Sequence, residues 1–155
     1  MEKVITPVLL GADLNCYNVA RAFHEQYGVK SYAFGRYAVS ATKYSRIVKF
    51  TAIKDIDSDP VMLDTLHRFA DAHLGEKLVL FGCTDDYVAM IIRNREELSD
   101  YILPYPPAEM LETVAHKAEF YETCDKFGIP HPDTVVLTEP KTAEDLTAEK
   151  LGFAY

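Results

Sequence analysis

The chain has 155 residues, of which 48% are hydrophobic and 26% are charged, a composition typical of a globular protein with one full domain and a sizeable core. Its formal net charge of −8 argues against a general nucleic-acid binder and against a protein of anionic membrane surfaces. The charge is uneven, because residues 26–54 include six basic residues and no acidic residue. This stretch is either a solvated basic surface or one wall of an anion-binding cleft.

Cysteine and histidine usage sets further limits. The three cysteines, Cys16, Cys83 and Cys124, form no CxxC motif and cannot all pair, which favours a reduced, cytoplasmic protein. The five histidines show no metal-ligand spacing, so no metal site is predicted. The start "MEKVITPV" lacks the pattern of a signal peptide, and no apolar run approaches the length of a membrane span.

The first two thirds of the chain alternate apolar runs with amphipathic segments. Strands are predicted over residues 7–12, 30–35, 45–53, 77–82 and 101–104. Helices are predicted over residues 14–27, from about 59 to 74, and over 84–94, with Thr84 as a cap and Gly28 and Gly75 as stops. Strands that alternate with helices and are apolar on both faces indicate a Rossmann-like, doubly wound α/β fold with a mainly parallel five-stranded sheet.

The pattern changes at "YPPAEM", where two prolines interrupt it. A helix divided near Thr113 and ending at Gly128 is predicted next, followed by a strand over 129–137 and a short helix in the last fifteen residues. We therefore predict one domain over residues 1–104 and a second region over residues 105–155. The second region would consist of a linker helix and the opening α+β segment of a further domain. The apolar face of this second region favours pairing with another surface, which includes the possibility of a homodimer.

The most informative loops follow the first and fourth predicted strands. With the usual strand order 3-2-1-4-5, a ligand crevice opens between these strands, lined by residues 11–15 and 82–86. A dinucleotide fingerprint requires three glycines, but here Asp13 and Cys16 stand where the second and third would be, after Gly11. The loop is therefore poorly suited to a nucleotide pyrophosphate.

The same loop suits a zwitterion such as an amino acid. Asp13 can pair with an ammonium group, Asn15 can donate and accept hydrogen bonds, and helix N-terminal amides attract a carboxylate. The alternative is that Asp13 or Asn15 only caps the helix. Thr84 and Asp85 have the same alternative, because a cap and first-turn acids stabilise a helix by themselves.

Two other features of the crevice are ambiguous. Arg36, just after the second strand, could hold the 2′-phosphate of NADP or another phosphate or carboxylate. Cys16 and Cys83 are both predicted at strand ends that face the crevice. His24 lies two helical turns from Cys16, which disfavours cysteine catalysis because a nucleophilic thiol needs a nearby base.

Three stretches together resemble the N-terminal part of ATP-grasp carboxylate–amine ligases, in the branch of D-aspartate ligases and carbamoyl-phosphate-synthase-like proteins. They are "VLLGADLNCYNVARAFHEQYG", "LVLFGCTDDYVAMIIRNREEL" and "HKAEFYETCDKFGIPHPDTVVL", and they cover most of residues 8–137. In this resemblance the Rossmann-like domain precedes a linking helix with a Lys-x-x-Phe/Tyr pattern, here Lys117, Phe120 and Tyr121. Residues 128–134 would then open the ATP-grasp domain.

The resemblance implies a two-step reaction, in which ATP phosphorylates a carboxylate and an amine then displaces phosphate to form an amide. ATP and Mg²⁺ would bind further along a full-length protein, so the catalytic residues stay unknown and the chain alone is expected to be inactive. The small-molecule carboxylate and amine substrates would contact a set of crevice residues: Gly11, Asp13, Asn15, Arg36, Thr84 and Asp85. The alternatives are an NADP-binding oxidoreductase domain and a non-catalytic small-molecule-binding module.

Overall fold

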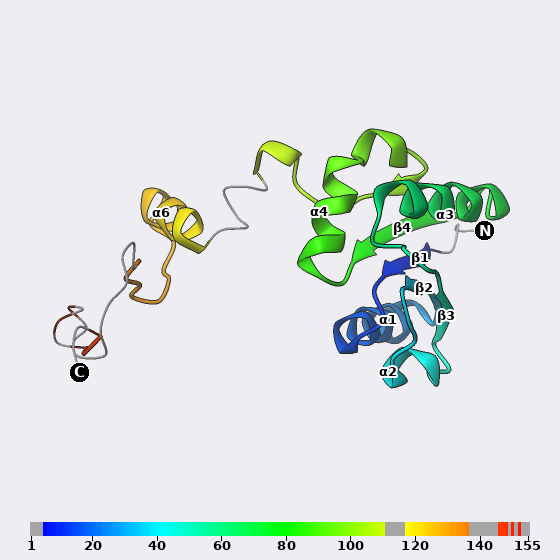
Figure 1. Ribbon diagram of the computed structural model, residues 1–155, viewed down its shortest axis with the longest axis horizontal. Coiled ribbons are helices and arrows are strands. Elements are labelled where there is room, and N and C mark those ends of the chain that lie inside the picture. Colours follow the sequence, from blue (N-terminus) through cyan, green and yellow to red (C-terminus); the bar gives the residue numbers. More distant parts are fainter. Residues whose placement is uncertain (1–4, 111–116, 137–145, 149, 151, 153–155) are drawn as a thin grey trace. The chain divides into compact units, whose positions relative to one another are not determined.

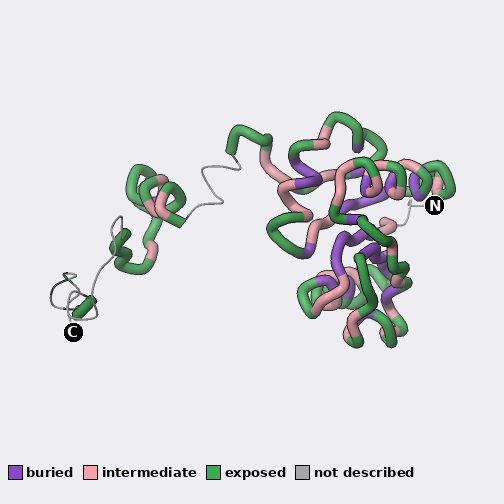
Figure 2. Tube along the Cα trace, viewed as in Figure 1, coloured by how far each residue is buried: buried purple, intermediate pink, exposed green. Residues whose placement is uncertain are grey.

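The computed structural model describes residues 5–110, 117–136, 146–148, 150 and 152. The chain divides into two compact units, Met1–Pro107 and Ala108–Tyr155. The first unit contains the sheet and nearly all of the buried residues (Figure 2). Within the described residues, no helix is long and apolar enough to cross a membrane.

The first unit is built on a five-stranded sheet with the order β3-β2-β1-β4-β5 (Figure 1). The strands are β1 (Ile5–Leu10), β2 (Ser31–Gly35), β3 (Val48–Ala52), β4 (Lys77–Gly82) and β5 (Tyr101–Ile102). Every neighbouring pair is parallel. The Rossmann-like fold class and the strand order predicted from the sequence are therefore confirmed.

Helices cover both faces of this sheet. α1 (Leu14–Tyr27) and α2 (Ser40–Lys43) lie on one face, and α3 (Asp59–Ala72) and α4 (Asp85–Arg93) lie on the other (Figure 1). α1 has the bounds that its sequence predicts, because the Asp13 side chain caps its start and Gly28 ends it in the left-handed conformation, with φ of 67°. Each βα joint therefore delivers a helix N-terminus to the same edge of the sheet.

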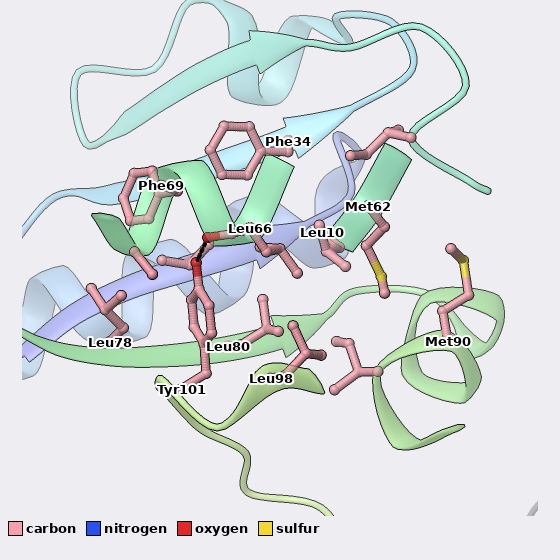
Figure 3. Packing of buried hydrophobic residues seen from close by; sticks show 14 residues of the cluster. Leu10, Phe34, Met62, Leu66, Phe69, Leu78, Leu80, Met90, Leu98 and Tyr101 are labelled. Atoms are coloured by element: carbon pink, nitrogen blue, oxygen red, sulfur yellow. Dashed lines mark hydrogen bonds between the residues drawn. The ribbon is translucent and has the colours of Figure 1, made fainter. Parts of the chain in front are cut away.

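Two apolar clusters hold these layers together. The larger lies between the sheet and α3 and α4, and Figure 3 shows how Leu10 and Leu80 of the sheet meet Leu66 of α3. In the same cluster the buried Tyr101 hydroxyl donates a hydrogen bond to the Leu66 carbonyl at 2.7 Å, which satisfies both polar groups (Figure 3). The smaller cluster, under α1, includes Leu9, Ala33, Val48, Cys16, Ala20 and Cys83.

Several predicted elements differ from the structure. The short helices α2 and η1 (Arg95–Leu98) were not predicted, since four residues give too little periodicity to detect. Residues 129–136 form no strand, so that prediction is wrong over the described part of the segment. A strand needs a hydrogen-bonded neighbour, and the structure provides none for these residues.

The second unit contains α6 (Lys117–Phe127), which ends at Gly128 as predicted. The predicted division near Thr113 and most of the predicted last helix lie outside the described residues. The assignment of this unit to the opening segment of a further domain stays a prediction.

Candidate functional site

An open pocket of about 270 Å³ lies at the carboxyl ends of β1, β2 and β4, and we call it the switch-point pocket. Strand order reverses there, since β2 and β4 flank β1 on opposite sides. Its lining residues are Gly11, Ala12, Asp13, Gly35, Arg36, Tyr37, Val39, Thr84 and Tyr87. The predicted crevice between the loops after β1 and β4 is therefore present, and the loop after β2 adds a third wall.

The two predicted loops lie side by side. Leu10 pairs with Gly82 in the sheet register, and one residue further on the Cys83 N–H donates to the Leu10 carbonyl at 2.8 Å. Of the six predicted contact residues, the lining contains Gly11, Asp13, Arg36 and Thr84. Asn15 and Asp85 are exposed and do not line the pocket.

Asp13 is the helix cap that the alternative interpretation described. Its Oδ1 accepts the Cys16 N–H at 3.0 Å, and the residue is half-buried at the pocket wall. A carboxylate has four lone-pair positions over two oxygens, so capping does not exhaust its hydrogen-bonding capacity. Asp13 can therefore cap α1 and contact a bound cation at the same time.

Arg36 brings a positive charge to the wall formed by the loop after β2. Its Nη1 donates to Asp57 Oδ2 at 2.9 Å, and both side chains are about half exposed. An ion pair this accessible is worth little and rearranges readily when a ligand carboxylate competes. The pocket thus carries a carboxylate, that of Asp13, and a guanidinium, that of Arg36, in the loops that follow β1 and β2.

Tyr87 joins these charged groups from the first turn of α4. Burial raises the pKa of its phenol, and the nearby Asp57 carboxylate raises it further, while Arg36 acts in the opposite direction. The phenol is therefore a neutral hydrogen-bonding group at physiological pH. Thr84 precedes it and caps α4, with its Oγ1 accepting the Tyr87 N–H at 3.4 Å.

Glycine is needed where the two loops approach each other most closely. Gly11 has a φ of 143°, and a Cβ placed there would lie 2.9 Å from the Cβ of Cys83. At Gly82 an added Cβ would lie 2.6 Å from the Val88 nitrogen, which belongs to the α4 backbone. Gly11 therefore lines the pocket, and Gly82 lets the first turn of α4 lie close to the end of β4.

The cysteines do not face the crevice, so that prediction is wrong. Cys16 and Cys83 are both buried in the cluster under α1, and neither lines the pocket. A hydrogen bond with Cys83, together with burial, raises the pKa of the Cys16 thiol strongly. Both are free thiols packed against Gly11, and the high pKa makes Cys16 a poor nucleophile.

Sequence reasoning identified Arg36 but missed the other lining residues from the loop after β2, and it missed Tyr87 from the first turn of α4. Tyr37 and Val39 lie just before α2, which was not predicted. The sequence around them therefore has no periodic pattern that would indicate their position. Tyr87 could have been found, because it lies one turn into a helix whose cap was predicted. Among the described residues, no three His, Cys, Asp or Glu side chains gather into a group that could hold a metal ion.

These observations define a Rossmann-like α/β domain with a small pocket at its switch point that contains two charged side chains. No family model matches the chain. The chain is similar to the D-aspartate ligase of Enterococcus faecium (strain Aus0004), with 34% identity over 153 residues that cover 96% of this chain and 36% of the ligase.

This similarity extends over nearly the whole chain and confirms the resemblance to D-aspartate ligases stated from the sequence. The chain spans 36% of the length of that relative.

Proposed function

We propose that this chain is the N-terminal, substrate-side part of an ATP-dependent carboxylate–amine ligase that forms an amide bond through an acyl phosphate. The observation that carries the proposal is the 34% identity to a D-aspartate ligase, together with a pocket that presents a carboxylate and a guanidinium at the switch point. In the proposed reaction, ATP transfers its γ-phosphoryl group to the carboxylate, releasing ADP. The amine nitrogen then attacks the acyl carbon and phosphate leaves.

The described residues do not fit ATP with Mg²⁺. The loop after β1 lacks the glycines of a nucleotide-binding loop, and the Asp13 carboxylate there would repel a phosphate. We therefore derive no step of phosphoryl transfer from this chain. In the proposal, ATP and Mg²⁺ bind in a region equivalent to the rest of the relative, and the chain alone is inactive.

The proposed role of the switch-point pocket is to bind an amino-acid substrate. Asp13 would pair with the ammonium group, and Arg36 would exchange its exposed partner Asp57 for a substrate carboxylate. Thr84 and the phenol of Tyr87 would add hydrogen bonds, since both side chains line the same pocket. We propose an acidic amino acid such as aspartate, in keeping with the name of the relative.

A titration of the isotope-labelled chain with D-aspartate, followed by amide NMR, tests this role. We expect saturable shifts at Gly11, Asp13, Gly35, Arg36 and Thr84. Asp13→Asn should weaken binding about tenfold or more while keeping the helix cap, since an amide oxygen also accepts the Cys16 N–H. Shifts spread over the whole surface, or none at saturating D-aspartate, would contradict the role.

Arg36→Gln tests the second charge, and Arg68→Gln is its matched control. Arg68 also forms an exposed ion pair, with Asp64 on α3, but it does not line the pocket. Only the first substitution should weaken binding of D-aspartate. The ligase activity itself is tested by ADP release in the presence of ATP, a carboxylate and an amine, using the 155-residue chain and any longer form of the protein.

The alternatives give different results in the same experiments. An NADP-binding domain would bind NADPH through Arg36, whereas the proposal expects no saturable binding of NADPH to the pocket. A non-catalytic binding module would bind the amino acid yet give no ligation in any longer form.

A further inference from the structure

A second concave surface lies between the start of α1, the short helix α2 and the residues that lead into β3. Its volume of about 470 Å³ exceeds that of the switch-point pocket and falls in the range of small-molecule sites. We call it the α2 pocket, and it is lined by Leu14, Tyr17, Ser40, Ala41, Tyr44, Ser45, Arg46 and Ile47. No carboxylate is among these residues, and none occurs anywhere in residues 26–54.

Arg46 has no partner in the part of the chain that the structure describes. The other five arginines each have one: Arg21, Arg36, Arg68 and Arg93 form ion pairs, and Arg95 donates to backbone carbonyls. Arg46 is exposed and lines the α2 pocket. A guanidinium without a competing carboxylate is free to bind an anion through two parallel hydrogen bonds.

Large side chains with apolar surface line the same pocket as this cation. The Tyr44 residue is 76% exposed and Leu14 is 63% exposed, while Tyr17 and Ile47 are half-buried. The Lys43 Nζ lies 5.2 Å from the centre of the Tyr44 ring, so a second positive charge lies close to a residue that lines the pocket. Tyrosine rings that face a pocket offer stacking surfaces for a flat ligand.

We propose that the α2 pocket binds a small molecule that combines a flat aromatic ring with a phosphate or carboxylate group. Arg46 would hold the anionic group in a bidentate contact, and the rings of Tyr17 and Tyr44 would contact the aromatic part. Ser40, which lines the same pocket, would supply a further hydrogen bond. This site does not depend on the proposed ligase function.

The α2 pocket is separate from the switch-point pocket but shares a wall with it. Val39 lines one pocket and Ser40 lines the other. The buried Thr42 hydroxyl donates to the Ala12 carbonyl at 2.7 Å and so fixes α2 to the loop after β1. A test must therefore distinguish binding in one pocket from binding in the other.

The test is an amide NMR titration of the labelled 155-residue chain with phenyl phosphate and, separately, with benzoate. We expect at least one of them to give saturable shifts at Tyr17, Ala41 and Arg46. Phenol and inorganic phosphate, each carrying half of the ligand chemistry, should bind at least about tenfold more weakly. Shifts confined to Arg36 and Thr84 would place the ligand in the switch-point pocket and would overturn the proposal.

Two exposed positions give variants that should fold normally. Arg46→Gln should weaken binding of the responding probe about tenfold or more, and Tyr44→Ala should weaken it severalfold. Arg21→Gln is the matched control, since it removes the same charge from an exposed position on α1 outside the pocket. An equal effect of Arg21→Gln, full binding by both pocket variants, or no saturation by either probe at about 10 mM would overturn the proposal.

Discussion

Asp13 shows how one residue can serve both the fold and the site. Its side chain caps α1, so its removal should weaken the domain whatever the pocket binds. We expect Asp13→Ala to lower the free energy of unfolding by about 0.5–2 kcal/mol and Asp13→Asn to lower it much less, because asparagine is an equally good cap. Urea unfolding measures both. Equal losses would show that the charge, rather than the hydrogen bond, stabilises the helix.

Gly82 lies next to the first turn of α4, which carries the lining residue Tyr87. A methyl group there would meet the α4 backbone at the Val88 nitrogen and the Tyr87 carbonyl carbon, at 2.6 and 2.8 Å, and backbone cannot move aside cheaply. We expect Gly82→Ala to destabilise the first unit by about 1–3 kcal/mol and to disturb the amides of the switch-point pocket.

Gly75→Ala is the control for that substitution. An added Cβ meets nothing within 4 Å at Gly75, although its φ of 84° adds conformational strain. Gly75→Ala should therefore leave the pocket amides unchanged in an NMR spectrum. Unchanged pocket amides in Gly82→Ala as well would mean that α4 can shift without cost.

At the scale of elements, the sheet is completed by a side chain from beyond its last strand. β5 has only two residues, and the Tyr105 hydroxyl accepts the Gly82 N–H at 2.7 Å where the strand no longer reaches. Arg95 then donates to the carbonyls of Tyr105 and Pro106. The residues just after the predicted boundary at 104 are thus fastened to the end of β4.

Tyr105→Phe should keep the ring contact with Phe81 but leave the half-buried Gly82 N–H without its acceptor. We expect a loss of about 1–3 kcal/mol in unfolding free energy and faster hydrogen exchange at the Gly82 amide. Tyr37→Phe is the control, since that ring is 69% exposed. Unchanged exchange at Gly82 in Tyr105→Phe would show that water replaces the hydroxyl.

In the second unit, His131 joins α6 to the segment that follows it. Its ring stacks on Tyr121, its Nε2 lies 3.0 Å from Asp125 Oδ1, and the hydrogen bond with Asp125 raises the pKa of the imidazole above 6.5. Because the pKa of the imidazole is higher in the folded state, the contact stabilises the folded state fully at a pH below the unfolded-state pKa. This stabilisation is lost as the pH rises through the folded-state pKa.

We therefore expect the imidazole of His131 to titrate above 6.5 in an NMR pH series, and Asp125→Asn to lower that pKa. Glu122→Gln, an exposed change one turn earlier, should leave it unaltered. A pKa that is the same in the Asp125→Asn chain would mean that the hydrogen bond does not persist in solution.

At the scale of the whole molecule, the sequence was most informative where local and long-range signals agree. The cap at Asp13 and the stop at Gly28 define α1, and continuous apolar strands define a parallel sheet whose usual order places two loops together. Three lining residues of the switch-point pocket, Gly11, Asp13 and Thr84, followed from that argument, and Arg36 was proposed from its place just after the second strand. The rest of the wall after β2 was not predicted, because it depends on α2, a four-residue helix with no side-chain cap.

The burial of Cys16 and Cys83 was also beyond sequence reasoning. Position at a strand end predicts the edge of the sheet but not the direction of a side chain, and here both thiols lie in the apolar cluster under α1. In the segment 129–136, by contrast, the sequence predicted a strand that the structure does not form. Its β-branched residues favour a strand, but a strand without a neighbour in the sheet cannot satisfy its backbone hydrogen bonds.

The two units should also differ in stability. The first unit has a continuous core, whereas α6 has a single buried side chain, Cys124, and leaves Phe120 and Phe127 exposed. The predicted apolar face of this region also includes Leu111 and Val114, which lie outside the described residues. We propose that it packs on a further domain or on a second copy of the chain, since exposed apolar patches of this kind mark interfaces.

Hydrogen exchange on the 155-residue chain tests this difference. Protection should be strong in β1 and β4 and much weaker in α6, because a helix with little buried surface opens locally without global unfolding.

Exchange measured at two protein concentrations distinguishes packing on a second copy of the chain from packing on a further domain. If a second copy covers the apolar face, protection of α6 should rise with concentration together with the molecular mass in solution, and Phe127→Ser should abolish that rise. Uniform protection from β1 through α6 in a chain shown to be monomeric would instead mean that residues 105–155 are an integral part of the first domain.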